Sequence, residues 1–126
     1  MSKPESIMID DVKYVKADSI KQESPLVDGM KCCIIRSYGA GVFAGYLKEK
    51  TSDVNGVNVT LINSRRIWYW SGACSLSQIA TEGSKKISDC KIAVVVPEQF
   101  IANVIEIIPM SKEAVKNIME AKEWKS

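Results

Sequence analysis

The chain has 126 residues, of which 46% are hydrophobic and 25% charged, which suits one globular domain with a single modest core. Its net charge of +2 is too small to indicate binding to a nucleic-acid polymer, and its apolar runs are too short to span a membrane. The sequence has no histidine, which excludes Ser-His-Asp and Cys-His catalysis, and with no CxxC pair either it argues against a zinc site. We therefore expect a binding protein with no catalytic residue, metal or cofactor.

The N-terminal part begins MSKPESIMIDD and has no extended apolar stretch of the kind found in secretory signals. Residues 6–17 predict a short hairpin turning at Asp10 and Asp11, followed by a loop that ends at Pro25 and Gly29. The four cysteines lack paired spacing, so we expect a cytoplasmic protein with reduced thiols in or near its core.

Three β-strands are predicted next, over residues 31–38, 42–50 and 57–70. The first two are rich in β-favouring residues and are separated by a glycine-containing turn. Asn55-Gly56, the strongest short-range hairpin signal in the chain, separates the second strand from the third. We therefore expect an antiparallel meander.

The third strand changes its pattern near Asn63, where apolar residues stop alternating with polar ones. A β-bulge at Asn63-Ser64 would exchange the two faces of the strand beyond that point. Whether Arg65 or Arg66 faces inward therefore stays open at the level of sequence.

A short middle helix is predicted over CSLSQIATEG, with Ser71 or Ser75 as its N-cap and its end at Gly83. Residues 90–97 predict a buried strand, and residues 98–109 a helical turn followed by a strand. The last part, residues 109–126, predicts a C-terminal helix capped by Ser111, whose apolar stripe Trp124 extends. The predicted fold is a single α+β domain, with residues 1–108 mainly β around the middle helix.

Three features indicate a site for a planar ligand that carries phosphate. The run RSYGAGVF contains a glycine turn whose N–H groups can face an anion, with Arg36 beside it. The run NSRRIWYW supplies guanidinium groups and aromatic rings, and SGACSLSQ opens a helix whose N-terminus favours anions. Each feature also has a purely structural interpretation: a hairpin turn, core aromatic residues and a helix cap.

These motifs, RSYGAGVFAGYL, NSRRIWYW and SGACSLSQIATEG, resemble those of the type 1 anti-Thoeris proteins of bacteriophages, over about residues 30–108. The resemblance implies a non-catalytic "sponge" that acts in the cytoplasm of the infected bacterial host. Such a protein sequesters glycocyclic ADP-ribose, a cyclic ADP-ribose isomer that TIR-domain proteins make from NAD. It also implies a homodimer or higher homo-oligomer with the ligand between protomers, and for some members a second site for cyclic oligonucleotides.

Residue roles follow from combining the motifs with such a ligand. We expect Arg36, Gly39 and Gly41, together with Arg65 or Arg66, to face the phosphates. Ser37, Tyr38 and Ala40 of the same turn are further expected ligand-binding residues. Phe43, Trp68 or Trp70 would stack on the base, and Asn63, Ser75, Ser77 and Gln78 would bind ribose hydroxyls. Two alternatives stay open, an enzyme that degrades the nucleotide signal and a phage structural protein.

Overall fold

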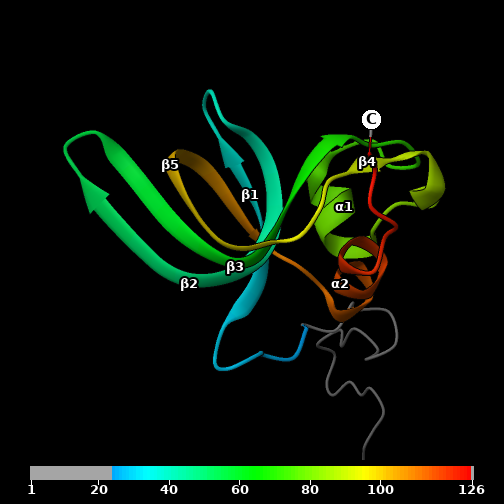
Figure 1. Cartoon of the computed structure of the whole chain (residues 1–126), viewed down its shortest axis with the longest axis horizontal. Coiled ribbons are helices and arrows are strands. Elements are labelled where there is room, and N and C mark those ends of the chain that lie inside the picture. The colour runs from blue at the N-terminus through cyan, green and yellow to red at the C-terminus, as the bar shows by residue number, and fades with distance from the viewer. Residues whose placement is uncertain (1–23, 126) are drawn as a thin grey trace, which may run out of the picture.

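The computed structural model describes residues 24–125, and the hairpin predicted at 6–17 lies outside this range. The fold is α+β, as predicted: an antiparallel five-stranded sheet with one mid-chain helix and one C-terminal helix (Figure 1). None of the helices within residues 24–125 has the length and apolar character needed to cross a membrane. The elements are β1 (Lys31–Ser37), β2 (Gly41–Asp53), β3 (Gly56–Tyr69), α1 (Leu76–Glu82), a 3-10 helix η2 (Ile87–Asp89), β4 (Lys91–Ile92), β5 (Val96–Pro109) and α2 (Lys112–Met119).

Strands β1, β2 and β3 form the predicted meander. Strand β2 pairs with β1 from Gly41 to Leu47 and with β3 over most of its length. The second hairpin turns at Asn55, where the Asp53 carboxylate accepts a hydrogen bond from the Asn55 N–H and Gly56 has a φ of 126°. The Asn-Gly signal is thus confirmed.

Strand β5 closes the sheet into a ring. It pairs antiparallel with β1 through Val104–Pro109 and with β3 through Val96–Val104. Since β1 also pairs with β2, and β2 with β3, four strands form a small closed barrel, and their strong bending is visible in Figure 1. The two-residue strand β4 extends the pairing of β3 beyond this ring.

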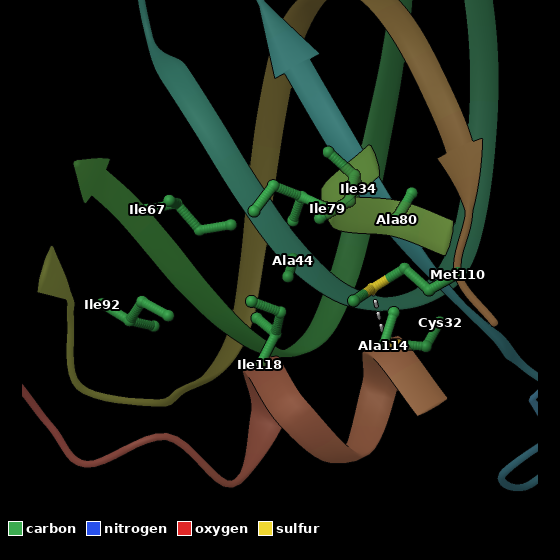
Figure 2. Packing of buried hydrophobic residues seen from close by; sticks show 10 residues of the cluster. All are labelled: Cys32, Ile34, Ala44, Ile67, Ile79, Ala80, Ile92, Met110, Ala114 and Ile118. Atoms are coloured by element: carbon green, nitrogen blue, oxygen red, sulfur yellow. Dashed lines mark hydrogen bonds between the residues drawn. The ribbon is translucent and has the colours of Figure 1, made fainter. Parts of the chain in front are cut away.

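Two apolar clusters lie on opposite faces of these strands, because side chains alternate along a strand. The barrel core lies inside the ring and consists of Cys33, Ile35, Phe43, Val59, Leu61, Ile101 and Val104. The helix-side core joins the outer face to α1 and α2 (Figure 2), and consists of Cys32, Ile34, Ala44, Ile67, Ile79, Ala80, Ile92, Met110, Ala114 and Ile118.

All four cysteines are free thiols. Cys32 and Cys33 are buried, one in each core, and Cys90 is half-buried. The prediction that all four lie in or near the core is wrong for Cys74, which is exposed just before α1.

The bulge predicted at Asn63-Ser64 is present. Ala44 pairs with Arg65 and Tyr46 with Ile62, so two steps along β2 match three steps along β3. Asn63 has a φ of 53°, in the left-handed region that asparagine tolerates better than most residues. The faces therefore exchange: Leu61 points into the barrel before the bulge, and Arg66 lies on that same face after it.

The C-terminal half corrects two predictions about strands. The predicted strand at 90–97 is interrupted: Lys91–Ile92 form β4, Val96 and Pro97 already belong to β5, and Val94 and Val95 between them are exposed. The helical turn predicted at the start of 98–109 is instead part of the long strand β5. Pairing with β3 supplies the hydrogen bonds that hold this segment extended, and tertiary pairing of this kind overrides local preference.

Both helices begin where the sequence indicates. Helix α1 has Ser75 as N-cap and Gly83 as C-cap, and Ser111 caps α2 by accepting a hydrogen bond from the Ala114 N–H. The predicted helix at 109–126 is too long, because α2 ends at Met119. Trp124 therefore does not extend the helical stripe, and its backbone N–H donates to the carbonyl of Ile92 in β4.

Candidate ligand-binding site

Arg66 lies at one end of the barrel, on the face that continues the barrel core. It pairs across the sheet with Phe43, and its guanidinium carbon is 4.5 Å from the centroid of the Phe43 ring. The Trp68 ring, two residues along the same strand, is 5.6 Å away. Nη1 of Arg66 also donates to the carbonyl of Ala40. We call Ala40, Gly41, Arg66 and Trp68 the barrel mouth.

The glycine turn lies directly against Arg66. Gly39 and Gly41 have φ values of 91° and 110°, which residues with a side chain rarely adopt. A Cβ atom on Gly41 would lie 3.5 Å from Nη1 of Arg66, whereas one on Gly39 would meet nothing within 4 Å. One side of the turn therefore packs on the guanidinium and the other is open, which suits an anion that approaches both.

Two aromatic rings are exposed, one beside the Arg66 guanidinium and one in the glycine turn. Trp68 is 62% exposed and Tyr38, in the turn itself, is 78% exposed. A single exposed ring needs no explanation, so these two rings count only together with the Arg66 guanidinium and the glycine turn beside them. Phe43 differs, because it is 1% exposed and covered by Arg66, so the expectation that it stacks on a base does not fit its position.

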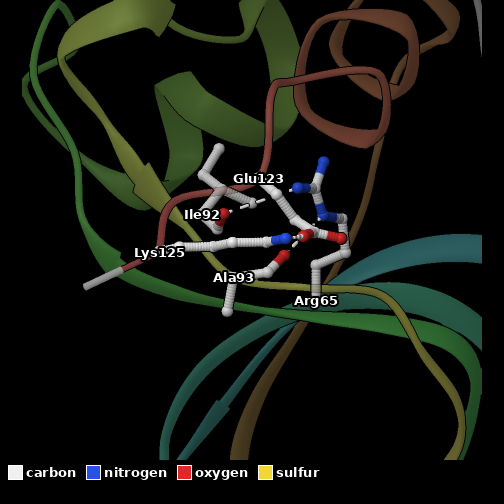
Figure 3. A network of polar contacts seen from close by, with 5 residues as sticks. All are labelled: Arg65, Ile92, Ala93, Glu123 and Lys125. Carbon is white, nitrogen blue, oxygen red and sulfur yellow. Dashed lines mark hydrogen bonds and ion pairs between the residues drawn. The ribbon is translucent and has the colours of Figure 1, made fainter.

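Arg65 points the other way and is 2% exposed. Figure 3 shows its guanidinium directed at the carbonyls of Ile92 and Ala93. Its Nε donates to the carbonyl of Ala93 at 2.8 Å, and its Nη1 to that of Ala121 at 2.7 Å. Further bonds of Arg65 reach the carbonyls of Ile92, Ile118 and Met119. Burial lowers the pKa of the guanidinium, and nearby Glu123 opposes that shift. Arg65 therefore ties α2 and β4 to the sheet, and we correct the expectation that it can hold phosphate.

Arg36 lies on the outer face of β1, the face opposite to Phe43 and Arg66. Its Nε is 3.2 Å from a carboxylate oxygen of Glu106, its partner across β1 and β5, and both side chains are about half exposed. Ser37, the next residue, is buried and donates to the carbonyl of Ala102 at 2.6 Å. A phosphate at Arg36 would have to compete with Glu106. The Ser37 hydroxyl already donates its proton to the carbonyl of Ala102.

The start of α1 is organised as a helix cap. Ser75 Oγ accepts a hydrogen bond from the Gln78 N–H at 3.2 Å, and Gln78 Oε1 accepts one from the Cys74 N–H at 2.9 Å. This reciprocal arrangement uses the groups expected to bind ribose. Ser77 remains exposed on the helix surface.

The other two predicted site residues, Asn63 and Trp70, also lie apart from the barrel mouth. Asn63 is exposed in the bulge, and Trp70 is partly buried against the helix-side core. The structure thus brings together the glycine turn, Arg66 and Trp68, and separates them from Arg65, Trp70 and the α1 cap.

Sequence reasoning missed Glu106 as the partner of Arg36, because only the non-local pairing of β5 with β1 brings these residues together. It also missed Lys91, whose ammonium lies 5.3 Å from the Trp124 ring and 6.0 Å from the Tyr69 ring. No local signal marks either relationship.

A groove of about 790 Å³ lies elsewhere, between η2, α2 and the segment that follows α2. Its lining carries both signs of charge, with Glu113, Glu120 and Glu123 beside Lys116 and Lys122. That balance suits an anionic ligand less well than the barrel mouth does. Within residues 24–125, no group of three or more Cys, Asp or Glu side chains is placed to hold a metal ion.

Comparison with known proteins gives one match. Residues 30–118 match a family described as a domain of unknown function, DUF6948. No curated protein and no solved structure matches the chain. The matched range begins just before β1 and ends within α2, so it contains the whole barrel and the barrel mouth.

Proposed function

We propose that this chain, which belongs to the DUF6948 family, is a phage anti-defence protein that binds and sequesters a cyclic ADP-ribose isomer without degrading it. The ligand would be glycocyclic ADP-ribose or a close isomer, made by TIR-domain proteins of the infected host. Holding this signal in the host cytoplasm would block Thoeris immunity. The resemblance of the sequence motifs to type 1 anti-Thoeris proteins supports the choice of ligand.

The observation that carries the proposal is the juxtaposition of Arg66, the glycine turn and Trp68. Arg66 donates through Nη1 to Ala40, and Nε and Nη2 have no hydrogen-bond partner among the described residues. These two nitrogens form a fork that matches a phosphate oxygen pair. The exposed Trp68 ring beside them offers a stacking surface for adenine.

Sequestration also fits the groups that this site offers. Binding a pyrophosphate and a base needs charge, hydrogen-bond donors and an aromatic face, and it needs no general base. The chain has no histidine, and the carboxylate of Glu106 is paired with Arg36 on the other face of the sheet. We therefore place this protein among binders, with release of the ligand as the slow step.

A second copy of the chain would complete the site. Tight small-molecule sites bury most of their ligand, and the barrel mouth is open on the side of Trp68 and Tyr38. A homodimer that covers these two rings would shield the charged ligand from water and slow its release. Size-exclusion chromatography with light scattering, with and without ligand, measures this assembly.

The test is a release assay. The purified protein is incubated with glycocyclic ADP-ribose, freed of unbound ligand, and denatured by heat, and the supernatant is analysed by chromatography and mass spectrometry. A sponge returns the ligand intact in a fixed ratio to protein. Recovery of hydrolysis products would establish a signal-degrading enzyme instead.

The matched control is Arg66→Gln, which keeps a polar side chain at the barrel mouth and removes its charge. This variant should retain no ligand through the separation step. If neither protein captures any of several cyclic ADP-ribose isomers, the proposal is wrong, and a structural role for the aromatic strand becomes the better explanation.

A further inference from the structure

We infer that Asn63 and Gly45 are positioning residues for the ligand site, because together they hold the bulge that turns Arg66 toward the barrel mouth. The inference rests on the proposed function in so far as Arg66 binds the ligand. The placement of the two arginines can nevertheless be measured without any ligand.

Asn63 supplies the backbone conformation that the bulge requires. Its φ of 53° lies in the left-handed region, where asparagine occurs several times more often than other residues with a side chain. A β-branched residue at this position strongly disfavours that conformation, and glycine adopts it freely. The side chain of Asn63 is exposed, so substitutions there change the backbone preference without disturbing the core.

Gly45 supplies the space for the extra residue. It lies opposite the bulge, between the pairs Ala44–Arg65 and Tyr46–Ile62. A Cβ atom on Gly45 would lie 3.1 Å from the Cα of Ser64 and 3.2 Å from the Cβ of Leu61, closer than side chains normally approach. The bulged backbone therefore occupies the volume that a side chain on Gly45 would take.

Ser64 shows how tightly the bulge is enclosed. It is 0% exposed, and its hydroxyl has no hydrogen-bond partner among the described residues. A small residue fits this space against Gly45 where a larger one would not. Burying a hydroxyl group without a hydrogen-bond partner costs free energy. Ser64 is therefore buried because the bulged backbone places it there, and not because its side chain forms a stabilising hydrogen bond.

The bulge decides which arginine is available. Side chains alternate along β3, so without the extra residue Arg65 would share the face of Leu61 and the barrel core. Arg66 would then face α2, where Arg65 now bonds the carbonyls of Ile118, Met119 and Ala121. One inserted residue thus assigns the structural role to Arg65 and the ligand-facing role to Arg66.

The experiment labels arginines with phenylglyoxal and locates the adducts by peptide mass spectrometry. In the wild-type protein we expect Arg66 to react about tenfold or more faster than Arg65, since Arg65 is enclosed. Asn63→Gly should keep that preference. Asn63→Val should lose it and should weaken binding of glycocyclic ADP-ribose by about tenfold or more.

Circular dichroism checks that each variant is folded, and Gly45→Ala replaces Asn63→Val if the latter is not. Equal labelling of Arg65 and Arg66 in the wild type would overturn the inference, as would a folded Asn63→Val or Gly45→Ala that keeps both the wild-type labelling and the wild-type affinity. If the wild type binds no cyclic ADP-ribose isomer but its labelling follows the expected pattern and shifts in the variants, the proposed function fails and the role of the bulge stands.

Discussion

Arg65 and Arg66 are consecutive in β3, yet their guanidinium groups lie on opposite faces of the strand. Arg65 is enclosed by carbonyl groups of β4 and of the residues at the end of α2. Arg66 lies over the Phe43 ring at the barrel mouth. The two residues are chemically identical, so any difference in the effect of replacing them reports position alone.

Replacing Arg65 should destabilise the protein far more than replacing Arg66. Arg65→Met leaves several carbonyls at the end of α2 and beside β4 without donors, and we expect a loss of about 2–4 kcal/mol in the free energy of unfolding. Arg66→Met loses a ring contact and one hydrogen bond, for about 1 kcal/mol. Urea denaturation followed by circular dichroism measures both, and equal losses would contradict these assignments.

Replacing Trp68 should affect ligand binding, whereas replacing Trp70 should affect stability. Trp68→Ala removes an exposed ring, so the free energy of unfolding should change little. The binding free energy should weaken by about 1–3 kcal/mol, which is the contribution of base stacking. Trp70→Ala removes a ring that packs on the helix-side core, so it should lower stability and leave the affinity of the folded fraction unchanged. Thermal melts and calorimetric titration of both variants check this. The reverse pattern would place the stacking surface at Trp70.

Glu106 should weaken anion binding rather than support it. Glu106→Gln removes a negative charge and frees Arg36, so we expect a modest gain in affinity for a phosphate-bearing ligand at low salt. Stability should change by less than about 1 kcal/mol, because the ion pair is exposed. Titrations at two salt concentrations test this expectation, and a clear loss of affinity would show that Glu106 itself contacts the ligand.

Alkaline pH should destabilise the fold through Cys32. Burial raises the pKa of this thiol from an ordinary value of 9.0 to about 12, so the folded state disfavours the thiolate. The unfolded chain releases the proton near pH 9, and stability from this group is therefore complete below that pH and is lost as pH rises toward 12. The unfolding free energy of Cys32→Ala, measured from pH 8 upward, should fall less steeply than that of the wild type. Parallel slopes would contradict the burial of Cys32.

Local signals were enough to predict the first half of the fold. The β-rich runs, the glycine turn and Asn55-Gly56 each act between near neighbours, and β1, β2 and β3 formed as expected. The change of pattern at Asn63 also predicted the bulge, because a bulge is a local backbone event. The caps Ser75 and Ser111 likewise operate within one helical turn.

The features that the sequence could not predict depend on contacts between residues that are far apart in the chain. Strand β5 is extended because β1 and β3 flank it, although its own residues read partly as a helix. The choice between Arg65 and Arg66 depended on the bulge and on the carbonyls of α2, which are more than fifty residues away. The pairing of Arg36 with Glu106 has the same origin, and it changes the value of Arg36 as a phosphate ligand.

The most direct test of the central claim is calorimetric titration of glycocyclic ADP-ribose into the wild type, Arg66→Gln and Arg65→Lys at one salt concentration. The account predicts saturable heat for the wild type, a loss of affinity of about tenfold or more for Arg66→Gln, and wild-type affinity for the folded fraction of Arg65→Lys. Wild-type affinity in Arg66→Gln, or no heat with the wild-type protein, would contradict it.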